Sequence, residues 1–209
     1  MVVFVVGTGR CGTKWLAEML GASKIAVVRH EPYGDELLEM NLKKETYIPS
    51  CLRSHRHYVE CNGYMTKYIE TLRGMYDAEI YSLVRDGRDV VRSFYNRHLF
   101  KDGTREQEYQ PQGETRFEKL CWWWNDQNRK AMSHGVPMIK FEDLLKDWGY
   151  FNLTFGFLEI PQTVWDRKRR SKVNAAKRHN LPHHSKWGAE QTMIFDKHCG
   201  SLMRGLGYK

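Results

Sequence analysis

The sequence predicts an α/β fold of three layers, in which a central parallel sheet of about five strands is flanked by helices. Short apolar runs alternate with helical patterns, and this alternation is typical of parallel sheets whose strands are joined by helices. The chain of 209 residues is 41% hydrophobic, enough to bury a core, and no Pro-, Gly- or Ser-rich linker divides it. We therefore expect a single domain over residues 1–209. The strands are expected at about 2–6, 24–28, 56–61, 79–84 and 136–140.

The first strand runs into a glycine-rich turn and then a helix, and this arrangement favours a bound phosphate. Gly7, Gly9 and Gly12 carry no side chain that would keep an anion away from the backbone. The following helix presents unpaired N–H groups and the positive end of its dipole. Arg10 and Lys14 add two cations at the same place. We therefore predict a phosphate-holding loop between this strand and this helix.

The same turn departs from the phosphate loop of ATP and GTP enzymes, G-x-x-x-x-G-K-[ST]. Gly7 and Gly12 have the spacing of that motif. The next residues are Thr13 and Lys14 rather than Lys and Thr, and Trp15 stands where a magnesium-binding hydroxyl would be sought. Phosphoryl transfer needs the metal to neutralise the migrating charge. The loop therefore indicates a reaction other than phosphoryl transfer. Such a reaction calls for a second anion site elsewhere in the chain.

A second anion site is predicted where the fourth strand ends. Residues 80–84 read as a buried strand, Asp86 and Gly87 as a turn, and the chain from Arg88 onward as a helix. Arg85 then lies at the carboxyl end of a strand, which is where open parallel sheets bind ligands. Ser93 lies two turns into the helix and can point back toward the same crevice.

Taken together, these stretches resemble the sulfotransferase family, which transfers a sulfuryl group from 3′-phosphoadenosine 5′-phosphosulfate (PAPS) to a hydroxyl or amine. Residues 10–15 resemble the family's 5′-phosphosulfate loop, K/R-x-G-T-T-x, although Lys14 replaces the second threonine. Arg85 and Ser93 resemble its 3′-phosphate motif. The resemblance implies the P-loop-like fold of that family. It also implies that PAPS, and its product adenosine 3′,5′-bisphosphate (PAP), contact Gly9, Arg10, Cys11, Gly12, Thr13, Lys14, Trp15, Arg85, Ser93 and Lys186.

The resemblance extends to later parts of the chain. Residues 136–144 look like the family's late strand and its "YEDL" turn, and residues 183–188 with 199–208 are similar to the ending of many bacterial members. Lys186 and Trp187 would close over the nucleotide, although Trp187 is nearly as well explained as a core residue. Residues 33–57 and 99–135 match nothing specific, so the acceptor stays open among glycan, lipid, tyrosine and small metabolite.

Sulfuryl transfer needs a base near the sulfur, because the acceptor hydroxyl must lose its proton. Glu31 follows the second strand and should reach the same edge of the sheet as the first loop. Carbohydrate and tyrosyl-protein sulfotransferases place a glutamate at a similar distance after their loop, so Glu31 is the preferred base. His30 and Glu60 are the alternatives. Neighbouring residues on an extended segment point to opposite sides, so His30 is expected to face away from Glu31.

These assignments predict a mechanism without a metal. Arg10 and Lys14 would stabilise the charge that develops on the bridging oxygen and the sulfuryl group, while Arg85 and Ser93 would select PAPS over ATP. Each residue also has an ordinary structural explanation, since Arg85 could merely pair with Asp86 or Asp89 and Ser93 could be an ordinary serine on the helix surface. A nucleotide or small-molecule kinase and a non-catalytic nucleotide-binding module are the alternative functions.

Charge and cysteine content narrow the remaining possibilities. The net charge of +8 is largely assigned to the two anion sites and to a basic run at 166–172, so we expect no nucleic-acid partner. The five cysteines show no C-x-x-C spacing and the chain starts directly with a strand, which together favour a cytoplasmic protein with no membrane span. The run Trp122–Trp124 covers more than one helical face, and packing is its better explanation.

Overall fold

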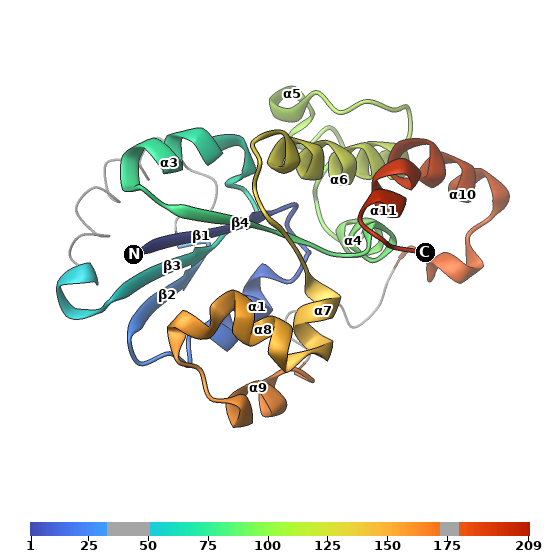
Figure 1. Ribbon diagram of the computed structural model, residues 1–209. Helices are drawn as coiled ribbons and strands as arrows, with labels where there is room; N and C mark the ends of the chain where they lie inside the picture. Colours follow the sequence, from blue (N-terminus) through green and yellow to red (C-terminus); the bar gives the residue numbers. More distant parts are fainter. Residues whose placement is uncertain (33–50, 172–179) are drawn as a thin grey trace. The chain divides into compact units, whose positions relative to one another are not determined.

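The computed structural model describes residues 1–32, 51–171 and 180–209. A five-stranded sheet has the order β2-β3-β1-β4-β5, and all of its strand pairs are parallel (Figure 1). Each predicted strand is present with slightly shifted ends, so the predicted α/β architecture is confirmed. The strands are β1 (Val2–Gly7), β2 (Ala26–His30), β3 (His57–Cys61), β4 (Glu79–Val84) and β5 (Met138–Lys140).

The chain forms two compact units. The first comprises Met1–Val84 with Ala131–Asn174, and the second comprises Arg85–Lys130 with Ala175–Lys209. The first unit holds the whole sheet, because the chain returns to it and adds β5 beside β4. The expectation of one domain over the full length stays a prediction.

Helices cover the sheet of the first unit on its two faces. Phe4 and Val6 alternate with residues of opposite direction along β1, and they pack with Ile69 and Leu72 of α3 in one apolar cluster. In Figure 1, α1 lies across the sheet from α3. Helices in the described part of this unit include α1 (Thr13–Leu20), η1 (Thr66–Tyr68), α3 (Ile69–Tyr76), α7 (Phe141–Lys146), α8 (Trp148–Phe155), η2 (Gly156–Leu158) and α9 (Gln162–Lys168).

The parallel strands bring several loops to one edge of the sheet. Gly7 at the end of β1 pairs with Leu83 near the end of β4, and His30 at the end of β2 pairs with Cys61 at the end of β3. The loops that follow these strands therefore leave the sheet at the same edge, where ligands of open parallel sheets bind.

The second unit is a group of helices with an aromatic core. Trp123 and Trp124 are buried, so packing accounts for two of the three tryptophans in the run, and Trp122 is partly exposed. Arg116 donates hydrogen bonds to carbonyls at the end of α4, including Phe94 O at 3.2 Å and Tyr95 O at 3.0 Å. The helices are α4 (Gly87–Phe94), α5 (Glu106–Tyr109), most of α6 (Arg116–Ser133), η3 (His184–Lys186), α10 (Ala189–Phe195), the π-helical η4 (Asp196–Gly200) and α11 (Ser201–Gly205).

The described part of the chain contains no helix that is both long and apolar enough to cross a bilayer. The five cysteines are all buried and free.

Candidate functional site

The loop between β1 and α1 has the backbone shape of an anion site. Gly9, Arg10 and Gly12 have φ values of 73°, 56° and 109°. Left-handed residues among right-handed ones turn successive backbone N–H groups toward one concave side, which suits an anion. A Cβ atom at Gly12 would lie 2.5 Å from the ring of Phe141, so this position requires glycine for space as well as for conformation.

Three of the loop residues predicted to contact the donor have buried side chains, namely Cys11, Thr13 and Trp15. Burial raises the pKa of the Cys11 thiol to about 11, so this cysteine is a packed thiol rather than a nucleophile. The indole of Trp15 packs edge-on against Phe141 and donates a hydrogen bond to the carbonyl of Lys168 at 3.3 Å. The side chains of Cys11 and Trp15 therefore support the loop, and only their backbone groups remain candidates for binding.

The ends of β2 and α1 bring a histidine, a carboxylate and a hydroxyl together. The Nε2 atom of His30 lies 3.3 Å from Oγ1 of Thr13 and 3.6 Å from Oε1 of Glu31. The expectation that His30 and Glu31 face opposite sides is wrong. Glu31 has a φ of 44°, so the extended strand geometry ends at His30 and the alternation of side chains ends with it.

Burial favours the neutral form of His30, and the charges around it act in both directions. Burial lowers the pKa of His30, the carboxylate of Glu31 opposes this shift, and the cations of Lys14 and Arg10 add to it. Both predicted loop cations are therefore close enough to His30 to act on it electrostatically. The structure thus brings together the predicted residues Arg10, Thr13, Lys14, His30 and Glu31.

The turn after β3 completes the surroundings of Glu31. The backbone N–H of Gly63 donates to Oε1 of Glu31 at 3.4 Å. A Cβ atom at Gly63 would lie 2.6 Å from Cα of Gly9, so this turn packs directly against the glycine-rich loop. Glu31 is therefore fixed between the second strand and the loop, with its side chain 25% exposed to solvent.

Glu60 has a different environment from Glu31. It is fully buried, and its two carboxylate oxygens accept hydrogen bonds from Tyr58 Oη at 2.8 Å and from Asn62 Nδ2 at 3.0 Å. Asn62 in turn accepts a hydrogen bond from the backbone N–H of Tyr64. These contacts give Glu60 a structural role in ordering the turn beside Glu31. A base must be within reach of the acceptor, and a fully buried carboxylate does not meet this condition.

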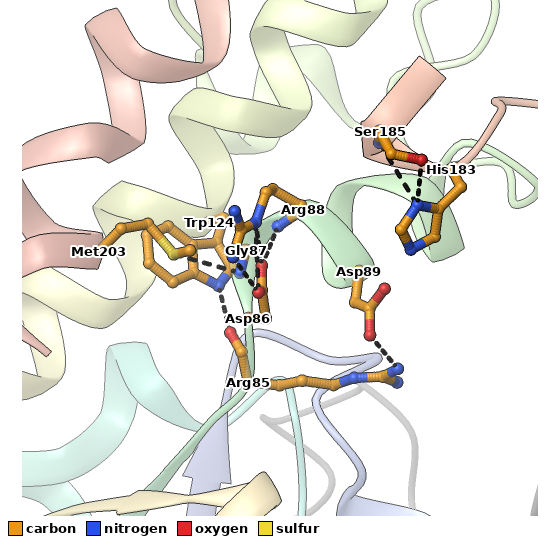
Figure 2. Close-up of polar contacts among 9 residues, drawn as sticks. All are labelled: Arg85, Asp86, Gly87, Arg88, Asp89, Trp124, His183, Ser185 and Met203. Carbon is orange, nitrogen blue, oxygen red and sulfur yellow. Dashed lines mark hydrogen bonds and ion pairs between the residues drawn. The ribbon is translucent and has the colours of Figure 1, made fainter. Parts of the chain in front are cut away.

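The second predicted anion site lies at the start of α4 (Figure 2). Asp86 caps this helix by accepting the backbone N–H of Arg88 at 2.9 Å, and its carboxylate also pairs with the Arg88 guanidinium at 2.6 Å. The guanidinium of Arg85 pairs with Asp89 at 2.7 Å. Arg85 thus makes one of the ordinary pairings considered from the sequence. Its planar group carries five N–H donors, which is more than one carboxylate can accept.

Two further predicted residues belong to the same unit. Ser93 lies in α4, the helix that begins two residues after Arg85. Lys186 is exposed in η3, and the neighbouring Trp187 packs against Phe117 and Phe195 with ring centroids 5.1 and 5.5 Å away. Trp187 is therefore held by aromatic packing.

Metal ligands are not gathered in the described ranges, where no group of three or more His, Cys, Asp or Glu side chains could hold an ion.

The structure also identifies residues that the sequence did not single out. Gly63 contacts both the loop and Glu31, and the Asn62-Gly63 pair directly after a strand is a turn signal that could have found it. Phe141 lies against Gly12, and Trp124 and Met203 contact the Arg85 turn. These contacts join residues far apart in the sequence, so no local sequence pattern predicts them.

Comparison with solved structures identifies proteins that have a similar fold. No protein-family model and no curated protein sequence matches the chain. Among solved structures, the chain is similar to mouse sulfotransferase SULT7A1 complexed with PAP, with a TM-score of 0.63 and 19% identity over 97% of this chain and 84% of that one. It is also similar to the sulfotransferase domain from the curacin biosynthetic pathway, with a TM-score of 0.61 and 13% identity over 99% and 97%. The chain has the fold of these sulfotransferases.

Proposed function

We propose that this protein is a sulfotransferase that moves a sulfuryl group from PAPS to a hydroxyl or amine acceptor. The proposal rests chiefly on one observation, the gathering of Arg10, Lys14, His30 and Glu31 around a loop with the backbone of an anion site. The likeness in fold to sulfotransferases, one of them complexed with PAP, supports it.

In the proposed reaction the loop after β1 binds the 5′-phosphosulfate. The acceptor oxygen attacks sulfur in line, its proton passes to the carboxylate of Glu31, and the bond between sulfur and the bridging oxygen of the phosphate breaks. The bridging oxygen stays on the 5′-phosphate of PAP and takes up a negative charge, which the cations of Arg10 and Lys14 stabilise. No metal is required in this scheme, because the loop and its two cations carry out the charge stabilisation.

His30 is the alternative base in this scheme. Its lowered pKa keeps it neutral near pH 7, as a base must be, and Glu31 lies beside it at 3.6 Å. Glu31 is preferred because its contact with the Gly63 N–H aims one carboxylate oxygen at the turn that packs on the loop.

The 3′-phosphate of the donor is assigned to Arg85 and Ser93. A guanidinium can bind a phosphate through two parallel N–H groups, and a serine hydroxyl adds a further donor. ATP and ADP lack this 3′-phosphate, so these two residues would select PAPS. The proposed location is cytoplasmic, and the acceptor class stays open among glycan, lipid, tyrosine and small metabolite.

Calorimetric titration of the Arg85→Ala variant tests the assignment of the donor. We expect it to weaken PAP binding by about 2 kcal/mol or more, which is about 30-fold, while leaving the weaker binding of ADP nearly unchanged. Arg73→Ala is the control, since Arg73 is an α3 arginine that pairs with Glu70. Unaltered PAP binding in the Arg85 variant, or equal losses for PAP and ADP, would contradict the assignment.

A further inference from the structure

The turn Arg85–Gly87, which carries the proposed 3′-phosphate site, is held from behind by two residues of distant helices (Figure 2). The indole Nε1–H of Trp124 in α6 donates to the carbonyl of Arg85 at 3.1 Å. The backbone N–H of Gly87 donates to the sulfur of Met203 in α11 at 3.4 Å. Both backbone groups flanking Asp86 are therefore bound by side chains.

Close packing around Gly87 also restricts the same turn. A Cβ atom at Gly87 would lie 2.9 Å from Cδ2 of the Trp124 ring and 3.2 Å from Cζ of Phe195. Trp124 itself is fully buried, and its carbonyl accepts a hydrogen bond from Nδ2 of Asn128 at 2.7 Å. The turn therefore rests on a fixed aromatic surface, and its backbone can shift little while these contacts last.

The sulfur of Met203 is an unusual acceptor for a buried N–H group. A thioether sulfur accepts hydrogen bonds weakly, so the contact holds Gly87 less firmly than an oxygen would. Trp124 provides the stronger contact, because an indole N–H to a carbonyl at 3.1 Å is an ordinary hydrogen bond. The two contacts act on opposite sides of Asp86, the residue that caps α4.

We propose that Trp124 and Met203 are positioning residues that set the affinity for the 3′-phosphate by fixing the backbone of the Arg85–Gly87 turn. This inference rests on the proposed function, since it takes the turn to be the 3′-phosphate site. Neither side chain touches the nucleotide in this account. They act through the position of the Arg85 backbone, from which the phosphate-binding guanidinium extends. They also act through the start of α4, the helix that carries Ser93 near its other end. The third tryptophan of the run at 122–124 thereby gains a role other than core packing.

The test measures the ratio of two dissociation constants, that of adenosine 5′-monophosphate (AMP) over that of PAP. The two nucleotides differ only in the 3′-phosphate, so the ratio isolates the affinity contributed by that group. Trp124→Phe keeps an aromatic ring but removes the indole N–H, and Met203→Leu keeps the volume but removes the sulfur. Loss of an ordinary hydrogen bond should lower the ratio about 3- to 10-fold in Trp124→Phe, and less in Met203→Leu. AMP binding alone should stay unchanged in both variants.

Trp123→Phe provides the matched control. Trp123 lies next to Trp124 in the same helix and is also buried, but its ring packs against Phe100 and Tyr109. A general loss of packing in this unit would therefore affect the two tryptophan variants alike. We expect Trp123→Phe to keep the wild-type ratio.

Three results would overturn the inference. The ratio could remain at the wild-type value in both Trp124→Phe and Met203→Leu, or fall equally in Trp123→Phe, or fall only because AMP binds more tightly. If Trp124→Phe fails to fold, Met203→Leu decides the question by itself. A wild-type protein that binds AMP as tightly as PAP would instead contradict the proposed function, so the two failures are distinguishable.

Discussion

The imidazole Nε2 of His30 and the carboxylate Oε1 of Glu31 lie 3.6 Å apart, although the two residues are adjacent in the chain. The left-handed backbone of Glu31 produces this relationship, because it turns the chain out of β2 directly after His30. Two groups that can accept a proton are therefore next to the glycine-rich loop, and their roles can be separated by substitution.

Glu31→Gln should lower the rate of sulfuryl transfer about 100- to 10,000-fold while leaving PAP affinity within about 2-fold of wild type. The amide keeps the size of the side chain but cannot take the acceptor proton. The measurement is PAP release from PAPS in the presence of an acceptor, paired with calorimetric titration of PAP. A non-catalytic binding module would show the same PAP affinity and no turnover in either protein.

His30→Gln tests the lowered pKa of His30. A histidine whose pKa is lower when folded stabilises the protein fully above its unfolded pKa, and this stability is lost as the pH falls toward the folded pKa. We therefore expect the wild-type free energy of unfolding to fall as the pH is lowered from about 7 to 5, and the fall to be smaller in the variant. Denaturant unfolding at several pH values measures this, and identical slopes would show that His30 titrates normally.

Gly63→Ala should disrupt the site from a position outside the loop. The new Cβ would meet backbone atoms of Gly9 at 2.6 and 2.7 Å, so the loop or the turn must move. We expect PAP affinity to fall about 10-fold or more, since a displaced loop cannot present its N–H groups correctly.

Gly74→Ala is the matched control for this substitution. Gly74 lies inside α3, and its Cβ would meet nothing within 4 Å. Alanine there should stabilise the fold by up to about 1 kcal/mol and leave PAP binding unchanged. Equal PAP affinity in the two glycine variants would show that the Gly63 turn does not support the loop.

Glu118 should make the second unit sensitive to acid. Hydrogen bonds from His198 at 2.8 Å and Lys197 at 3.0 Å lower the pKa of its carboxyl to about 2. The stability that these contacts provide is present above the usual pKa of glutamate and is lost as the pH falls through about 2.

Glu118→Gln should therefore cost about 1–3 kcal/mol of unfolding free energy at pH 7, and the difference from wild type should shrink toward pH 2. Urea unfolding over this pH range measures the difference. Glu114→Gln, at an exposed acid four residues away, is the control and should cost less than about 0.5 kcal/mol. A loss that does not change with pH would mean that the charge of Glu118 is unimportant.

Most of the sheet could be predicted from the sequence, because buried parallel strands are short continuous apolar runs separated by helical patterns. The glycine-rich loop could also be predicted, because the glycines that mark it in the sequence are required by the structure. Gly9 is required by its backbone conformation, and Gly12 by the space that Phe141 leaves. The edge of the sheet at which Glu31 lies followed from the parallel order of the strands.

Two features could not be predicted, and both depend on contacts between distant residues or on a single backbone angle. The strand rule that separates His30 from Glu31 fails at the positive φ of Glu31, which no local pattern announced. The support of the Arg85 turn by Trp124 and Met203 joins residues 39 positions apart in one contact and 116 apart in the other. Periodicity identifies which tryptophans are on a helix, but not which carbonyl a buried indole reaches.

The most direct test of the central claim is calorimetric titration of the wild-type protein, first with PAP in the presence of a metal chelator and then with magnesium-ATP. The account predicts tight binding of PAP without metal and weak binding of magnesium-ATP, because Arg85 and Ser93 select the 3′-phosphate. Tight binding of magnesium-ATP with weak binding of PAP would contradict it and would make a nucleotide or small-molecule kinase the better description.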